Sequence, residues 1–396
     1  MTKQLRRALN VVAPFGIPLA WKQLASDRKR LVTAIVGVTF GIVLMLFQLG
    51  LYNAINLMVI LPHQRLKGDL YLISPDWDFF GSSRTFTRRR VQQIAAFPEV
   101  QSATPVYFGY VLWTNPVNHK SKGALCIAFN PEENPFLPDV LRQQTESLRH
   151  PEAVLFDRLS QSDYGPIEKL MASNPELEVD VEHKRAMVRG LYSMGSTLSA
   201  SANIIMSDEA WFRYRPDMPR NMANLGVIIL RPGANVEAVA ARVRDALPND
   251  VEVVTRHDFA AAEQAYWNKR TPVGFVVGAG MLVGMLVGAI VVYQILYSDV
   301  NDHLREYATL KALGIADSFF VLLVLQEALI LVALGTLPAL VLTEVVNSFA
   351  RESVNLPAYI EPKQVITVLG GVALTSLMAG YLATRRLRAA DPASVF

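Results

Sequence analysis

The chain has 396 residues, of which 51% are hydrophobic and only 18% are charged, and its mean hydropathy is +0.24. Soluble domains carry about 25% charged residues on average, so this composition argues against an ordinary cytosolic enzyme. A single cysteine, Cys126, excludes an intramolecular disulfide framework and a multi-cysteine zinc site, and a net charge of +3 is too small to indicate nucleic acid as a partner.

Four stretches with almost no charge hold most of the apolar excess, and we expect them to be membrane-spanning helices. They lie at 31–52, 272–297, 319–343 and 365–384. The first would cover roughly 33 Å at 1.5 Å per residue, which is enough to cross the hydrocarbon core. It ends on the bulky residues Leu51 and Tyr52 rather than on the small residues of a cleavage site, so we interpret it as an uncleaved anchor.

Basic residues lie close to both ends of this set of spans. They precede the first span and follow the last one: Lys3, Arg6, Arg7, Lys22, Arg28, Lys29 and Arg30, then Arg385, Arg386 and Arg388. Basic residues near span ends mark the cytoplasmic side, so we expect a multi-pass membrane protein with both termini in the cytoplasm. Its cytoplasmic parts would be an amphipathic segment 1–30, a loop 298–318 and a tail 385–396. Its extracytoplasmic parts would be a domain 53–271 and a short loop 344–364.

The large domain between the first two spans shows two β-α-β patterns. The strand, helix and strand of each are expected at 69–74, 87–97 and 102–113, and at 225–230, 235–247 and 251–255. Two such segments around a proline-rich middle predict a split ferredoxin-like unit of the porter type, with an inserted subdomain at about 130–219. The fold class is thus an α+β membrane protein with four transmembrane helices and a large extracytoplasmic α+β domain. Cys126 lies in an apolar strand and is expected to be a small core residue.

The chain shows no pattern typical of a catalytic, metal or nucleotide site. Its six histidines are scattered without metal-ligand spacing, and neither a GxxxxGK[ST] loop nor a GxSxG elbow is present. The glycines at 278–284 lie in an apolar span rather than after a strand, which argues against a dinucleotide loop. We therefore expect no catalytic residue, no metal and no cofactor in this chain.

Glycines in the first two spans repeat at intervals of four residues. They are Gly37, Gly41, Gly274, Gly278, Gly280, Gly284 and Gly288. Small residues at this spacing let membrane helices approach closely, so they predict either packing within one bundle or a seam between two copies.

The third span contains two adjacent polar residues, Gln326 and Glu327. A carboxylate at the centre of a bilayer costs about 3 kcal/mol on insertion scales, so such residues usually face a partner, a cavity or the interface. Glu327 lies about two turns from the start of the span. Both an interfacial or packing role and a functional role remain open.

The loop between the second and third spans has the pattern of a short amphipathic helix. Val300, Leu304, Tyr307 and Ala308 form one apolar stripe, and Gly314 is suited to end the helix. Such a helix is expected to press against a cytoplasmic protein. The alternative, a helix lying on lipid, would carry more basic residues.

This loop resembles the signature of the FtsX/MacB-type ABC transporter permeases, in Arg305–Gly314 (REYATLKALG) and Leu325–Ala328 (LQEA). Further stretches resemble the DevC permeases of DevBCA-type exporters. These are Pro18–Leu24, Phe47–Gly50, Gly68–Leu70, Tyr293–His303 and Ala390–Phe396. The resemblance runs in order along the whole chain, whereas the middle of the large domain, about 142–219, matches no pattern of the family.

The resemblance implies a four-span permease of the bacterial inner membrane, with a MacB-like periplasmic domain at 53–271 and a short periplasmic loop at 344–364. It also implies that the permease works as a dimer with two copies of a separate ATPase that binds ATP and Mg²⁺. It also implies a periplasmic membrane-fusion adaptor and a TolC-like outer-membrane duct, contact with membrane lipid, and a glycolipid as the best-known cargo. The residues implied to contact the ATPase are Val300, Asn301, His303, Leu304, Arg305, Glu306, Tyr307, Leu310, Lys311 and Gly314.

Three functions follow from these observations. The favoured one is a permease subunit that transmits ATP-driven motion to the periplasmic domain and drives export of an amphiphile, with no enzymatic activity of its own. A second is an FtsX-like transmitter that regulates a periplasmic enzyme without transport. A third is a membrane-anchored enzyme whose active site is assembled only by folding.

Overall fold

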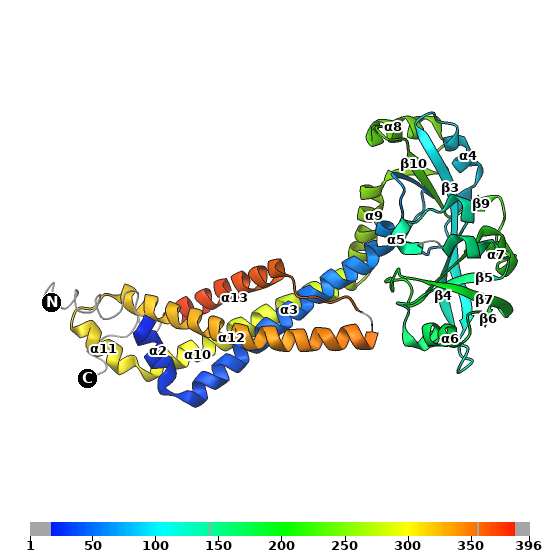
Figure 1. The fold of residues 1–396 in the computed structure, drawn as a ribbon. Helices are drawn as coiled ribbons and strands as arrows, with labels where there is room; N and C mark the ends of the chain where they lie inside the picture. The colour runs from blue at the N-terminus through cyan, green and yellow to red at the C-terminus, as the bar shows by residue number, and fades with distance from the viewer. Residues whose placement is uncertain (1–16, 142–143, 355, 385–396) are drawn as a thin grey trace. The chain divides into compact units, whose positions relative to one another are not determined.

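The computed structural model describes residues 17–141, 144–354 and 356–384 (Figure 1). The contacts divide the chain into two compact units, one formed by Met1–Ala54 with Gly274–Phe396 and the other by Ile55–Val273. Lys3, Arg6, Arg7 and the predicted tail 385–396, with its three arginines, lie outside the described residues.

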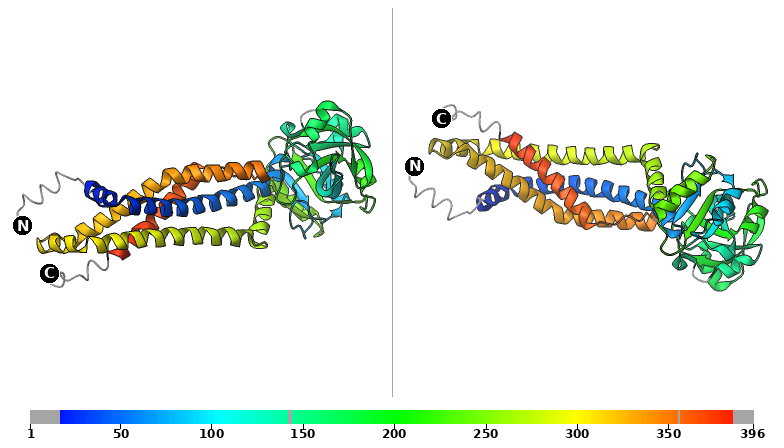
Figure 2. Two further views of the ribbon diagram at one scale, coloured as in Figure 1. Left: turned by 90° about the horizontal axis from the view of Figure 1, so that it is seen from below. Right: turned by 90° about the horizontal axis from the view of Figure 1, so that it is seen from above.

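The first unit is a bundle of helices. It is formed by α2 (Ile17–Ser26), α3 (Arg28–Arg65), α10 (Val273–Asp302), α11 (Leu304–Ala312), α12 (Asp317–Val354) and α13 (Pro362–Ala383). In the part of the chain that is described, α3, α10, α12 and α13 are the helices long and apolar enough to cross a membrane. Figures 1 and 2 show them running alongside one another. The number and order of the predicted spans are confirmed.

Two of these helices are much longer than the spans that hydropathy predicts. α3 and α12 have 38 residues each, or roughly 57 Å, nearly twice the thickness of a hydrocarbon core. Hydropathy marks only the part that crosses lipid, and both helices continue beyond it, α12 as far as Val354. The prediction of a loop over the whole of 344–364 is therefore wrong. The ion pair between Arg351 and Glu344, at 2.6 Å, joins two residues seven positions apart, or about two turns, in this helical extension.

Apolar side chains at helical spacing form the core of the bundle. Val38, Ile42 and Leu46 of α3 recur every four residues and are at most 2% exposed. They share one buried cluster with side chains of the other long helices: Val292, Leu296, Val324, Leu331, Val368 and Val372.

The second unit is built on a sheet of nine strands in the order β11-β1-β10-β3-β4-β8-β5-β7-β6. The strands are β1 (Leu70–Ile73), β3 (Val100–Thr114), β4 (Ser121–Phe129), β5 (Ala153–Asp157), β6 (Leu177–Val181), β7 (Lys184–Tyr192), β8 (Asn203–Ser207), β10 (Leu225–Leu230) and β11 (Glu252–Thr255), and β2 (Phe86–Thr87) pairs separately with β9 (Met222–Ala223). The helices are α4 (Arg89–Ala95), α5 (Pro138–Leu141), α6 (Ile167–Ser173), α7 (Asp208–Tyr214), α8 (Val236–Ala246) and α9 (Arg256–Lys269), with short 3₁₀ turns η1 (Pro131–Glu133), η2 (Gln144–Arg149) and η3 (Ser162–Tyr164).

One end of the sheet is the predicted split ferredoxin-like unit. Its two halves are β1-α4-β3 and β10-α8-β11, and the four strands interleave as β11-β1-β10-β3, all antiparallel. Val91 and Ile94 of α4 and Val239 and Val243 of α8 are buried in one shared cluster against the strands. The sequence-based prediction of this fold class is confirmed.

The segment between the two halves does not form a separate unit. β3 is long enough to pair with β6 at its far end, where Trp113 lies opposite Val181 and Thr114 opposite Asp180. The strands β3-β4-β8-β5-β7-β6 thereby close into a ring, and this ring shares its core with the ferredoxin-like half. Cys126, on β4, is fully buried, which confirms its prediction as a core residue; burial raises the pKa of its thiol.

Candidate functional site

The segment between the second and third spans contains a helix of its own. α10 ends at Asp302, His303 follows, and α11 occupies Leu304–Ala312. The chain then turns at Gly314, whose φ of +89° is a left-handed conformation that glycine adopts at little cost. The N–H of Gly314 donates to the carbonyl of Lys311 at 2.9 Å. The predicted role of Gly314 as a helix terminator is confirmed.

The apolar stripe of this segment faces the bundle. Val300, Tyr307 and Ala308 are 1%, 2% and 4% exposed, and Leu304 packs against the same buried cluster. Side chains buried within their own chain cannot also meet a cytoplasmic protein. Val300 and Tyr307 are therefore anchoring residues rather than contact residues, which changes the role that the resemblance implies for them, whereas Leu304 is only half-buried.

The other implied coupling residues lie at different depths. Asn301, His303, Leu310 and Lys311 are half-buried, whereas Arg305, Glu306 and Gly314 are exposed. Arg305 and Glu306 project from α11 on the side opposite its anchor, and Lys311 forms a 3.1 Å ion pair with Asp317 at the start of α12. The surface open to a partner is thus smaller than the ten residues expected from sequence.

Tyr307 is the main anchor of α11. Its ring packs on Phe320 of α12 with 5.2 Å between centroids, and its hydroxyl accepts a 3.0 Å hydrogen bond from Gln23 of α2. Burial raises the pKa of the Tyr307 hydroxyl, so this group remains a neutral phenol. One side chain of α11 thus connects two other helices of the bundle.

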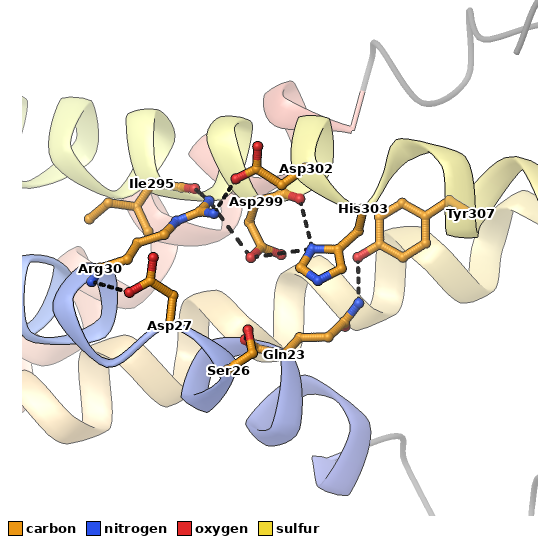
Figure 3. A network of polar contacts seen from close by, with 9 residues as sticks. All are labelled: Gln23, Ser26, Asp27, Arg30, Ile295, Asp299, Asp302, His303 and Tyr307. Atoms are coloured by element: carbon orange, nitrogen blue, oxygen red, sulfur yellow. Dashed lines mark hydrogen bonds and ion pairs between the residues drawn. The ribbon is translucent and has the colours of Figure 1, made fainter.

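A charged network lies beside this anchor (Figure 3). Asp27 caps α3 by accepting the backbone N–H groups of Lys29 and Arg30, and so fixes the direction in which Arg30 leaves the helix. The Arg30 guanidinium donates to Asp302 at 2.6 Å and to the carbonyl of Ile295 at 2.7 Å. Arg30 therefore holds the start of α3 against the end of α10.

Asp299 sits at the centre of this network and is only 3% exposed. Its Oδ1 lies 3.7 Å from the guanidinium of Arg30 and 3.7 Å from Nδ1 of His303. Its Oδ2 has no hydrogen-bond donor among the described residues. The first oxygen of Asp299 thus lies near Arg30 and His303, and the second one has no donor among the described residues.

Glu327 of α12 is completely buried, with 0% exposure, and neither of its oxygens has a donor within the described part of the chain. Its neighbour Gln326 is half-buried. Of the interpretations that the sequence left open for Glu327, its burial inside the bundle fits a packing role, and a functional role stays a prediction.

The repeated glycines bring α3 and α10 together within this chain. A Cβ atom on Gly41 would lie 3.0 Å from the Cα atom of Gly288, and one on Gly284 would lie 3.2 Å from Leu44 and Met45. Cβ atoms on Gly37 and Gly280 would collide with Val291 and Gln48. These contacts show packing within one bundle. Gly278 has open space around it and Gly274 is half-buried, so these two residues do not take part in the same way.

Within residues 17–141, 144–354 and 356–384, no group of three or more histidine, cysteine, aspartate or glutamate side chains could hold a metal ion. The residues gathered at this site instead form ion pairs and buried helix contacts. Such an arrangement suits the transmission of motion between helices.

Comparison with protein families assigns the chain to a class of transporter subunits. The MacB-like periplasmic core domain matches residues 31–246, more than half of the chain, and the FtsX-like permease C-terminal domain matches residues 278–392. The chain belongs to the FtsX/MacB-type family of ABC transporter permeases. Permeases of this family are non-catalytic subunits, so membership implies a separate ABC ATPase as partner.

Solved structures provide more distant likenesses. The periplasmic region of MacB from Actinobacillus actinomycetemcomitans is 12% identical, with a TM-score of 0.37 over 50% of this chain and 94% of that chain. The extracellular domain of the ABC-type transporter YknZ from Gram-positive bacteria is 8% identical, with a TM-score of 0.33 over 48% and 99%. A domain of a putative permease from Porphyromonas gingivalis is 12% identical, with a TM-score of 0.31 over 48% and 89%. Among curated proteins, no sequence matches this chain.

Sequence reasoning missed the partners of the coupling segment. It treated Arg30 only as a basic residue flanking a span, and it did not single out Asp299 or Gln23. The spacing of Asp299 and His303, four residues apart across the end of α10, was a usable indication that their side chains meet. The pairing of Arg30 with Asp302, 272 residues away, had no local indication.

Proposed function

We propose that this chain is the permease of an exporter and transmits ATP-driven motion of a separate ATPase to its extracytoplasmic domain. The observation that carries the proposal is the design of α11. One face is buried in the bundle through Tyr307 and Ala308, and the opposite face exposes Arg305 and Glu306. A force applied to that exposed face reaches α2 and α12 directly through Tyr307.

The motion has continuous helices to travel along. α3 is one unbroken helix from Arg28 to Arg65, and its residues belong to both compact units. α10 begins at Val273, where the β-rich unit ends. The chain thus passes between the two units along α3 and at the start of α10. A displacement at Asp302, at the end of α10, would be transmitted along α10 toward the β-rich unit.

The cargo is proposed to be a lipid, a glycolipid or another amphiphile, as in DevC-type exporters. It would leave through a periplasmic adaptor and a TolC-like duct, with the permease acting as a dimer. The apolar character of the spans supports a cargo that does not thread through the bundle, because a polar conduit would require more polar side chains within the membrane.

The proposed topology places both termini in the cytoplasm and the domain 55–273 in the periplasm of a bacterium, across the inner membrane. Lys29 and Arg30 at the start of α3 support it, since basic residues at span ends favour the cytoplasmic side. The exposed face of α11 would then be available to a cytoplasmic ATPase.

The test is to replace Glu306 by alanine and to compare this variant with Glu352→Ala, which removes an exposed glutamate at the other end of α12. Glu306→Ala should insert normally but lose ATPase-coupled export, and Glu352→Ala should keep it. Full export by Glu306→Ala, with unchanged ATPase association, would contradict the proposed role of α11.

A second function is favoured by the FtsX-like match over residues 278–392. The same transmission would then regulate a periplasmic enzyme, and nothing would be exported. Purification of the tagged chain distinguishes the two functions, because an exporter should bring an adaptor and a duct, and a regulator should bring a cell-wall hydrolase.

A further inference from the structure

The meeting of two buried carboxyl groups on α10 and α12 is not explained by the proposed function. The side chains of Asp299 and Glu327 lie within hydrogen-bonding reach of each other. Both are almost completely buried, at 3% and 0% exposure. Two ionised carboxylates are acceptors only, so a direct hydrogen bond between them requires a proton on one of them.

The surrounding groups indicate which carboxyl group carries that proton. Asp299 Oδ1 lies 3.7 Å from the guanidinium of Arg30 and 3.7 Å from the imidazole of His303. Asp299 Oδ2 and both oxygens of Glu327 have no donor among the described residues. Three buried acceptor atoms without a donor are costly in a bundle core. A proton on Glu327, donated to Asp299 Oδ2, supplies the missing hydrogen bond.

The charges around the pair balance under this assignment. The positive charge of Arg30 from α3 balances the negative charge of the ionised Asp299. Asp302 contacts the other terminal nitrogen of the same guanidinium, but its side chain is mostly exposed. Among the described residues, His303, which follows α10, and the neutral Tyr307 of α11 are further titratable groups beside the pair. An ionised Glu327 would instead add a second, unpaired negative charge to a buried site.

We propose that Asp299 and Glu327 form a proton-binding site that holds α10 against α12 immediately beside the coupling helix. Glu327 keeps the proton and donates a hydrogen bond to the ionised Asp299, whose charge Arg30 neutralises. α10 and α12 are the two helices that α11 connects, so the shared proton closes the base of this helical hairpin. The site belongs to the chain itself and does not depend on which ATPase or cargo the permease serves.

Infrared spectroscopy of the full chain in lipid nanodiscs tests this assignment. At about pH 7 exposed carboxyl groups are ionised, because their ordinary pKa values are about 4. The wild-type spectrum should contain a protonated-carboxyl band, and Glu327→Gln should lose an amount equal to one group per chain. Glu352→Gln, an exposed control on the same helix, should keep the full band. Identical bands in wild type and Glu327→Gln would overturn the proposal.

A second variant keeps the test decisive if Glu327→Gln does not fold. Asp299→Asn offers Glu327 an amide donor in place of the shared proton, so the band should again fall by one group per chain. A band that persists in Asp299→Asn would show that burial alone retains the proton, which would overturn its sharing by the pair. Where Glu327→Gln does fold, its thermal midpoint should equal that of wild type, since glutamine has the shape and charge of the protonated acid. A large drop in that midpoint would show that the ionised form is the one that stabilises the bundle.

Discussion

Tyr307 gives the sharpest test of how α11 is held in the bundle, because its ring and its hydroxyl make different contacts that can be removed separately. The ring is 98% buried against Phe320, and the hydroxyl has one hydrogen-bond partner given by the structure, Gln23, at 3.0 Å. Removal of a buried aromatic ring costs about 3–5 kcal/mol, whereas the net contribution of one neutral hydrogen bond is about 1 kcal/mol. Tyr307→Phe should therefore be mild, and Tyr307→Ala should be severe.

The assay is unfolding of the full chain in detergent, followed in parallel by ATPase-coupled export in membranes. Tyr307→Phe should lower the free energy of unfolding by about 1 kcal/mol and retain export. Tyr307→Ala should lower it by about 3–5 kcal/mol and uncouple export. Leu313→Ala is the matched control, since this side chain is 58% exposed in the same segment and its loss should change little. Equal stability and equal coupling in Tyr307→Ala and wild type would refute the anchoring role.

Three further changes test other parts of the structure. Gly41→Leu should separate α3 from α10 and destabilise the bundle by about 1–3 kcal/mol, measured by thermal unfolding. Its control, Gly278→Leu, adds a side chain in open space and should be tolerated. Equal effects of the two substitutions would argue against the glycine contact. Gly314→Ala forces a side chain into a left-handed turn at a cost of about 1–2 kcal/mol, and should weaken coupling measured as ATP-driven export. Asp157→Leu leaves the N–H groups of Met194 and Gly195 without their buried acceptor, at about 1–3 kcal/mol per group, so amide exchange there should accelerate in the full chain.

The membrane spans and the ferredoxin-like half could be predicted because their patterns are local. Apolar runs of sufficient length identify membrane helices, and two β-α-β patterns define a four-strand unit without knowledge of distant contacts. The limits of the helices could not be predicted in the same way. Residues 53–65 of α3 are less apolar than the span before them, but they remain helical, and hydropathy does not distinguish a helix from a loop outside lipid.

The ring of strands and the charged network depend on pairings between residues far apart in the chain. Trp113 pairs with Val181 across the closure of the ring, and Arg30 meets Asp302 from another helix. No local spacing encodes either contact. The burial of Glu327 belongs to the same class, since its place inside the bundle depends on where α10 lies against α12.

The exposed face of α11 is proposed to receive force from a separate ATPase. The most direct measurement is purification of the tagged full chain from native membranes, with and without the double substitution Arg305→Ala and Glu306→Ala. Wild type should retain an ABC ATPase in stoichiometric amount, and the double variant should lose it while remaining folded in the membrane. Retention of the ATPase by the double variant, or its absence from wild type, would contradict the account.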